Sequence, residues 1–118
     1  MRRMFLKGKI HHAVVIESNL EYEGSMGVDE TLLKAVDMAP YEKVSVFNVT
    51  NGARFSTYLI KEKADSGRIA VYGAAAHKAG RGDRLIIVSY AQLEEGEIAG
   101  FRPKIIVLDG ENRIKTIK

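Results

Sequence analysis

The chain has 118 residues, 46% of them hydrophobic, which suits one domain with a modest core and requires no second domain. It contains no cysteine, which excludes disulfides, thiolate zinc sites and a thiol nucleophile. The formal net charge of +3 is dispersed, so it permits an acidic ligand or a nucleic acid without demanding either. No apolar run reaches the length of a signal sequence or a transmembrane helix, and we expect a cytoplasmic protein with no membrane partner.

Residues 4–16 form the first predicted strand, because they are rich in apolar and β-branched side chains. Lys7, Lys9 and His11 occupy alternating positions, so regular strand geometry predicts that their side chains share one face. Three polar side chains on one face can line a pocket. The alternative is a solvated strand face, which fits Lys7 better than Lys9 or His11.

Residues 20–26, Leu-Glu-Tyr-Glu-Gly-Ser-Met, contain the peptide bond on which the functional interpretation centres. Gly24 can adopt backbone conformations closed to other residues, so strain is most easily placed there. The Ser25 hydroxyl can attack the Gly24 carbonyl and exchange an amide for an ester. Elimination and hydration would then leave a pyruvoyl group at a new N-terminus. The alternative is an ordinary turn, since Glu-Gly-Ser is common in turns.

A short helix and a hairpin are predicted next. Asp29 caps the helix over residues 30–36, which has an apolar side for the core. A strand over residues 43–50 leads into Asn51-Gly52, the strongest hairpin signal in the chain. The return strand covers residues 54–60.

A two-residue loop at Asn51-Gly52 fixes how the hairpin strands pair. Val49 would then lie opposite Arg54, and Phe47 opposite Ser56. One face is the predicted core face and carries Val44, Val46, Phe55, Thr57 and Leu59. The other face suits binding because it combines an arginine with hydroxyl and aromatic side chains, and it carries Ser45, Phe47, Val49, Arg54, Ser56 and Tyr58.

Residues 68–72 are predicted to form a short strand that stops at Gly-Ala-Ala-Ala-His, residues 73–77. Small side chains there let backbone amides approach a ligand, although a tightly packed turn explains the same residues. Buried strands over residues 85–90 and 105–108 follow. Many short strands with little helix in so short a chain predict a small β-barrel.

Four groups of residues together resemble the aspartate 1-decarboxylase family: Lys9-Ile10-His11, Tyr22-Glu23-Gly24-Ser25, Asn48 to Gly52 with Arg54 to Tyr58, and Gly73 to His77. Several motifs in order are far more specific than Glu-Gly-Ser alone. The resemblance implies a mainly β fold, a six-stranded double-psi β-barrel with short helices. It also implies a homotetramer with active sites at subunit interfaces, and one domain over residues 1–118 that self-cleaves into residues 1–24 and 25–118.

The implied reaction converts L-aspartate to β-alanine and carbon dioxide for pantothenate synthesis. Decarboxylation needs an electron sink, which a pyruvoyl group made from Ser25 provides through an imine with the substrate amine. We therefore expect neither pyridoxal phosphate nor a metal. Aspartate carries two carboxylates, and Arg54 and Lys9 are the expected cationic partners.

The resemblance assigns further roles. Tyr58 would protonate the intermediate left by carbon dioxide, and Thr57 would bind the Gly24 carbonyl oxygen during cleavage and lie near the substrate afterwards. Backbone groups of three small residues would hold the substrate: Gly73, Ala74 and Ala75. Weaker candidates line the site: His11, Tyr22, Phe47 and Tyr72. Among these, Phe47 replaces a frequent tryptophan of the family and Tyr72 a frequent asparagine.

Thr57 and Tyr58 present a geometric conflict, because neighbours in a regular strand point to opposite faces and one face is the core. We therefore expect either a site at a subunit interface or a twist or bulge in this strand.

Two other classes of function fit a small basic β-barrel. An oligonucleotide-binding module usually interleaves basic residues with stacking aromatics, and this chain has too few aromatics, so we expect no nucleic-acid partner. A barrel that never matures could act as a structural or regulatory partner of another protein. The joint presence of Ser25, Arg54, Thr57 and Tyr58 argues against this second class.

Overall fold

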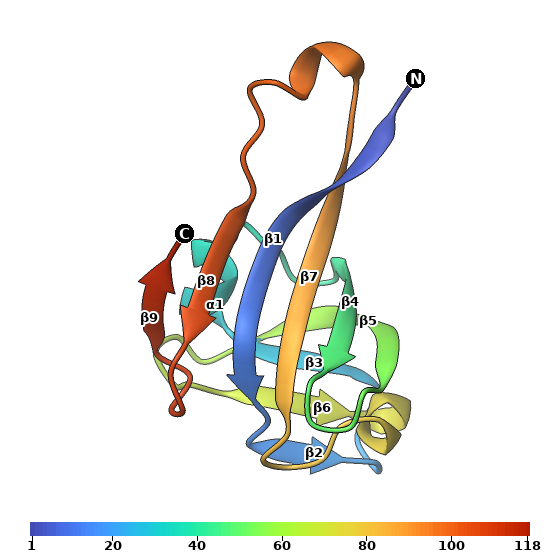
Figure 1. The fold of residues 1–118 in the computed structure, drawn as a ribbon. Coiled ribbons are helices and arrows are strands. Elements are labelled where there is room, and N and C mark those ends of the chain that lie inside the picture. The colour runs from blue at the N-terminus through green and yellow to red at the C-terminus, as the bar shows by residue number, and fades with distance from the viewer.

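A computed structural model describes residues 1–118 of the protein (Figure 1). Strands dominate, with one short α-helix and two 3-10 turns. In chain order the elements are β1 (Arg3–Val14), β2 (Glu17–Asn19), β3 (Ser25–Asp29), α1 (Glu30–Ala35), β4 (Lys43–Asn48), β5 (Arg54–Glu62), β6 (Ile69–Tyr72), η1 (Gly73–His77), β7 (Arg84–Leu93), η2 (Glu95–Glu97), β8 (Lys104–Leu108) and β9 (Ile114–Ile117). No helix is long and apolar enough to cross a bilayer.

The strands form one hydrogen-bonded series in the order β2-β6-β3-β5-β4-β7-β1-β8-β9. The mainly β prediction is confirmed, and the compact arrangement agrees with a small barrel-type fold. The series contains nine strands and does not close on itself, whereas six barrel strands were expected. The two end strands, β2 and β9, are only 3 and 4 residues long.

One apolar cluster of 19 buried residues holds these strands together. It joins strands that are distant in sequence, because Ile10 of β1, Met26 of β3, Leu59 of β5 and Ile87 of β7 are all fully buried. Burying side chains of this size stabilises a fold by about 1.5–3 kcal/mol each. The core therefore fixes the positions of β3 and β5, the two strands that carry most of the candidate site residues.

The first strand is confirmed, but Lys7 does not share a face with Lys9 and His11. The β1–β7 register slips between Leu6 and Gly8, so Lys7 sits at a bulge. Its ammonium donates to the Asp37 carbonyl and pairs with Glu42, both at 2.7 Å. The bulge therefore turns Lys7 toward the segment after α1.

The capped helix is confirmed, because the Asp29 side chain accepts from the Thr31 amide at 2.8 Å. The same carboxylate also accepts from the amides of Asp65 and Gly67. Asp29 is only 1% exposed, and these three amides satisfy a charge that would otherwise be costly to bury.

The hairpin is confirmed, but its predicted register is wrong by two residues. Arg54 pairs with Phe47 rather than with Val49. The loop is longer because the Asn48 side chain accepts from the amides of Thr50 and Asn51, which draws both residues into the turn. A shift of two leaves the two faces unchanged, and Val44, Val46 and Leu59 are buried on the core face as predicted.

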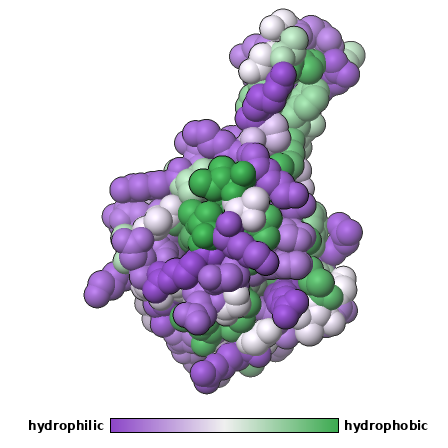
Figure 2. All heavy atoms as spheres, turned by 60° about the vertical axis from the view of Figure 1, so that its left-hand side comes forward, coloured by the Kyte–Doolittle hydropathy of each residue, from purple (hydrophilic) through white to green (hydrophobic).

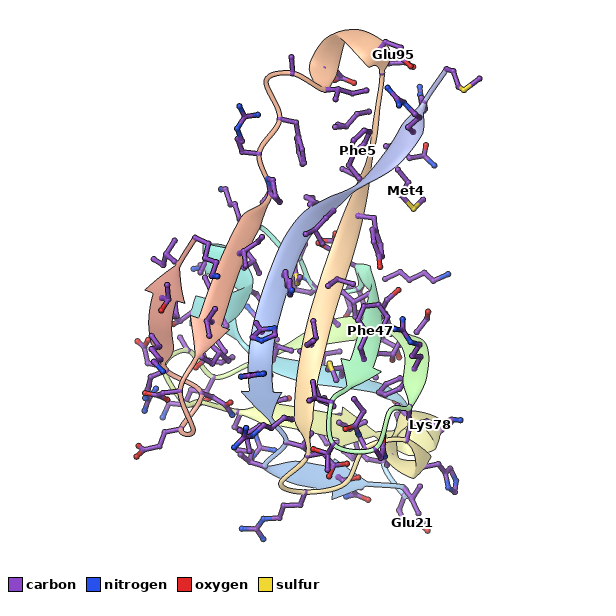
Figure 3. The ribbon with its side chains drawn as sticks, viewed as in Figure 1. Met4, Phe5, Glu21, Phe47, Lys78 and Glu95 are labelled. Atoms are coloured by element: carbon purple, nitrogen blue, oxygen red, sulfur yellow. The ribbon has the colours of Figure 1, made fainter.

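An arm projects from the body where the start of β1 pairs with the end of β7, and η2 lies at its tip (Figure 1). Figure 2 shows the arm as a narrow projection with mixed hydropathy, and Figure 3 places Met4 and Phe5 on it and Glu95 at its tip. The ion pairs Arg2–Glu94 and Arg3–Glu95 join its two sides, both at 3.0 Å. Such exposed pairs contribute about 0–1 kcal/mol.

Candidate active site

A cavity of about 530 Å³ opens beside the Gly24–Ser25 bond. Its walls come from the start of β3, the first half of β5, the end of β6, and η1. The lining residues are Gly24, Ser25, Phe55, Ser56, Thr57, Tyr58, Tyr72, Ala74, Ala75 and Lys78. Most of the residues expected to carry out cleavage and bind substrate are therefore together in one chain.

Ser25 is the first residue of β3 and only 3% exposed, whereas Gly24 before it is exposed. Ser25 pairs with Tyr72 across the antiparallel β3–β6 ladder. Gly73, with φ +69°, packs against Gly24 so closely that a Cβ on Gly73 would lie 2.6 Å from the Gly24 Cα. Only glycine fits at this position, which explains why the small-residue run begins there.

The Tyr58 hydroxyl donates to the Gly24 carbonyl oxygen at 2.7 Å. This places a polarising donor on the carbonyl that the Ser25 hydroxyl would attack. The resemblance gave this contact to Thr57, which lines the same cavity but makes no hydrogen bond to Gly24 in the uncleaved chain. Tyr58 is 43% exposed, so its phenol is also open to the cavity.

Thr57 and Tyr58 both reach the cavity within one chain, and β5 has no bulge. Residues 54–58 of β5 pair with β4, while pairing with β3 begins only at Leu59. The β3-side edge of residues 54–58 therefore has no strand partner, and four consecutive residues of this edge line the cavity. A cavity at a strand edge is accessible from both faces, so the conflict between Thr57 and Tyr58 does not by itself require a second subunit.

The two expected cations do not line the cavity of a single chain. Arg54 is exposed one residue before the lining segment, and its guanidinium lies 4.4 Å from the centre of the Phe47 ring. Lys9 is on β1, and β4 and β7 lie between β1 and β5. The structure of one chain therefore separates Lys9 from Ser25.

His11 also lies on β1, away from this cavity. Its ring stacks on His12 with centroids 3.9 Å apart, and its Nδ1 is buried without a hydrogen-bond partner. Burial, followed by the charges of His12, Lys9 and Lys118, lowers the pKa of His11 below its ordinary value.

Tyr22 and Tyr72 contact each other at the edge of the site, with ring centroids 4.7 Å apart. Tyr22 is 58% exposed and Tyr72 only 6%. Burial raises the pKa of the Tyr72 phenol, and its hydroxyl accepts a hydrogen bond from Arg68 at 3.2 Å. The phenol of Tyr72 is therefore held neutral at the wall of the cavity.

The sequence did not single out Lys78 as a site residue. Lys78 directly follows η1 and is the only basic residue among those lining the cavity (Figure 3). Its carbonyl accepts from the side chains of Asn48 and Asn51, which ties η1 to the hairpin loop. The only feature of the sequence that could have indicated Lys78 as a site residue is its position just after the small-residue run at residues 73–77. Ser56 was assigned to a binding face but not to this site.

Comparison with known proteins agrees with this geometry. The sequence model of a family described as aspartate decarboxylase matches residues 1–115. An aspartate 1-decarboxylase of Ralstonia nicotianae is 53% identical over 118 residues, which is 100% of this chain and 98% of the relative. Those of Syntrophobacter fumaroxidans and Acaryochloris marina are 55% and 52% identical, and the matches span 96% and 97% of this chain and 91% and 87% of those relatives. The chain belongs to the aspartate decarboxylase family.

Proposed function

We propose that the protein decarboxylates L-aspartate to β-alanine and carbon dioxide, and so supplies β-alanine for pantothenate synthesis in the cytoplasm. The observation that carries this proposal is the buried Ser25 beside a cavity, with its preceding carbonyl held by Tyr58 at 2.7 Å. Relatives that are about half identical over nearly their whole length are named aspartate 1-decarboxylase.

The first step of the proposal is self-cleavage between Gly24 and Ser25. The Ser25 oxygen attacks the Gly24 carbonyl carbon, the C–N bond breaks, and an ester joins the two segments. β-Elimination releases residues 1–24 with a carboxylate at Gly24. Addition of water to the remaining dehydroalanine and loss of ammonia leave a pyruvoyl group at the start of residues 25–118. The Tyr58 hydroxyl stabilises charge on the Gly24 oxygen during the attack.

The residues around Ser25 fit a pyruvoyl group. The position is buried at the wall of a cavity of about 530 Å³, which has room for a small amino acid. A pyruvoyl group supplies an electron sink for the bond that loses carbon dioxide. Tyr58 holds a proton on its phenol oxygen and delivers it to carbon, and Thr57 stays at the cavity wall near the substrate. Backbone groups of residues 73–75 orient the substrate, with Ala74 and Ala75 lining the cavity.

Binding of the two substrate carboxylates involves Arg54 and Lys9 in this proposal. Since β4 and β7 separate Lys9 from Ser25 in one chain, Lys9 reaches the substrate from a neighbouring subunit. A homotetramer with active sites at subunit interfaces meets this requirement. The exposed Arg54, stacked on Phe47 beside the cavity, lies where a neighbouring chain can approach it.

Carbon dioxide release from L-aspartate tests the proposal. Cleaved protein is expected to form β-alanine and carbon dioxide in equal amounts, and borohydride in the presence of aspartate is expected to add substrate mass to residues 25–118. Ser25→Ala is the control and should show neither result. Fully cleaved protein that neither releases carbon dioxide nor traps aspartate would overturn the assignment of substrate.

A further inference from the structure

An ion cluster lies on the outer face of the sheet beside the site. Arg68, just before β6, donates through Nε to Glu62 at 2.8 Å and through Nη2 to Glu17. The side chains of Arg68 and Glu62 are 33% and 15% exposed. Two carboxylates from β2 and β5 thus hold one guanidinium in a fixed orientation, which its planar fork of donors favours.

Gly27 makes room for this cluster in β3. A Cβ on Gly27 would lie 2.8 Å from the Glu62 Cδ, so any larger residue would displace the Glu62 carboxylate. Gly27 is two residues after Ser25 in the same strand, so a Cβ at position 27 would point to the same face of the sheet as the Ser25 side chain. Because Gly27 has no side chain, the Glu62 side chain can extend across β3 and reach Tyr72 of β6.

Tyr72 completes the cluster. Its hydroxyl accepts from Arg68 at 3.2 Å and donates to Glu62 at 3.4 Å, so three side chains close a triangle. Tyr72 is also the cross-strand partner of Ser25, and its ring packs on Tyr22. The cluster therefore connects through Tyr72 to residues on both sides of the Gly24–Ser25 bond.

Gly73, the residue after Tyr72, makes a second contact with the segment before Ser25. Gly73 lies directly against Gly24, and a Cβ there would also be 3.2 Å from the Tyr22 carbonyl oxygen. A movement of Tyr72 would carry Gly73 with it. Residues 22–24 thus pack against Tyr72 and Gly73, and Arg68 is hydrogen-bonded to Tyr72.

We propose that Tyr72 is a positioning residue for the Gly24–Ser25 bond, and that Arg68, clasped by Glu17 and Glu62, holds Tyr72 in place. This inference rests on the proposed self-cleavage. Tyr72 keeps Tyr22 and Gly24 docked so that the Ser25 hydroxyl faces the Gly24 carbonyl. The ion cluster sets the position of Tyr72 through the hydrogen bonds of its hydroxyl to Arg68 and Glu62.

Two measurements test this role. The first is the rate at which the two fragments appear, followed by intact mass in Arg68→Met, Tyr72→Phe and Gly27→Ala. We expect Arg68→Met to cleave at least about tenfold more slowly than wild type, because small misplacements of reacting groups are costly. Arg68→Lys should recover part of the rate. Lys7→Met is the matched control, since it breaks a half-buried ion pair whose members do not line the cavity, and it should cleave at the wild-type rate.

The second measurement does not depend on cleavage. In a Ser25→Ala background, which cannot cleave, amide hydrogen exchange over residues 22–26 should be faster with Arg68→Met or Tyr72→Phe and unchanged with Lys7→Met. A general loss of stability would instead raise exchange in all strands alike.

Equal cleavage rates and equal exchange over residues 22–26 in the cluster variants and Lys7→Met would overturn the inference. Absence of cleavage in wild type would overturn the proposed function, and the exchange measurement would still decide whether Arg68 holds the segment.

Discussion

At the scale of single residues, Tyr58 is the group that faces both steps of the proposed chemistry. In the intact chain its hydroxyl donates to the Gly24 oxygen, and its side chain is also exposed to the cavity. Its role in turnover was predictable from the resemblance in sequence. The contact with Gly24 was not, because it depends on β5 passing beside the loop before β3.

Tyr58→Phe separates these two roles. A net contribution of about 0.5–1.5 kcal/mol for one hydrogen bond predicts cleavage that is slower by several-fold but still complete. Loss of a proton donor predicts turnover lower by about 10²–10⁴. Intact mass gives the first rate, and carbon dioxide release by the fully cleaved variant gives the second. Wild-type turnover in this variant would contradict the role of Tyr58 as proton donor.

His11 is expected to make stability depend on pH. The pKa of His11 is lowered in the folded chain. As pH falls, position 11 is therefore protonated more readily in the unfolded chain than in the folded chain, which favours unfolding. Stability from neutral His11 is therefore fully present above its ordinary pKa of 6.5 and is lost as pH falls through the lowered value. Urea unfolding at about pH 7.5 and about pH 5.5 should show a smaller change in His11→Gln than in wild type. An equal change in both proteins would refute this assignment.

At the scale of elements, the start of η1 is shaped by the contact of Gly73 with Gly24. Gly73→Ala places a methyl group 2.6 Å from the Gly24 Cα and also has to adopt φ +69°, so cleavage should be abolished. Gly52→Ala is the matched control, because Gly52 has φ +79° with no atom within 4 Å of an added Cβ. Fragment formation by intact mass should be normal in Gly52→Ala. Normal cleavage in Gly73→Ala would show that this close contact is not required.

Asn112 joins three segments of the fold. It is 2% exposed, its Oδ1 accepts from the Val14 amide, and its Nδ2 donates to the carbonyls of Val14 and Gly67, all at 2.8 Å. Asn112→Ala leaves these three backbone groups without their side-chain partner and should cost on the order of 1–3 kcal/mol in urea unfolding. Asn19→Ala, on the short edge strand β2, should cost less than about 0.5 kcal/mol. Similar losses in both variants would refute the joining role.

Elements of this protein could be predicted from sequence where local residues decide them. Asp29 caps α1 as expected, and the apolar alternation placed Val44, Val46 and Leu59 in the core. The hairpin register could not be predicted, because the side chain of Asn48 competes with Asn51-Gly52 for control of the turn. The Arg68 cluster was also missed, since its members come from separate segments that meet only in the folded sheet.

At the scale of the whole molecule, strand order separates residues that one reaction would use. Ser25 and Tyr58 lie at one cavity, while Lys9 lies beyond β4 and β7. The motifs predicted one site that contains Ser25, Tyr58 and Lys9. The strand order that separates Lys9 from the other two could not be predicted from the sequence. The site shared between chains that we propose would bring these residues together.

Mixed assemblies test this sharing. Chains with Lys9→Ala and chains with Ser25→Ala should each be nearly inactive alone. Co-expressed, they should regain part of the activity, because a Ser25 from one chain can meet a Lys9 from the other. Carbon dioxide release by the purified mixture measures the gain. No gain in assemblies shown by mass to contain both chains would contradict a site shared between subunits.

Self-cleavage of the Gly24–Ser25 bond is tested by the intact mass of the purified protein, followed over time. We expect two fragments, residues 1–24 and residues 25–118, the larger with a blocked N-terminus, and a single chain in Ser25→Ala. A wild-type chain that remains whole after prolonged warm incubation, with an ordinary serine at position 25, would contradict it.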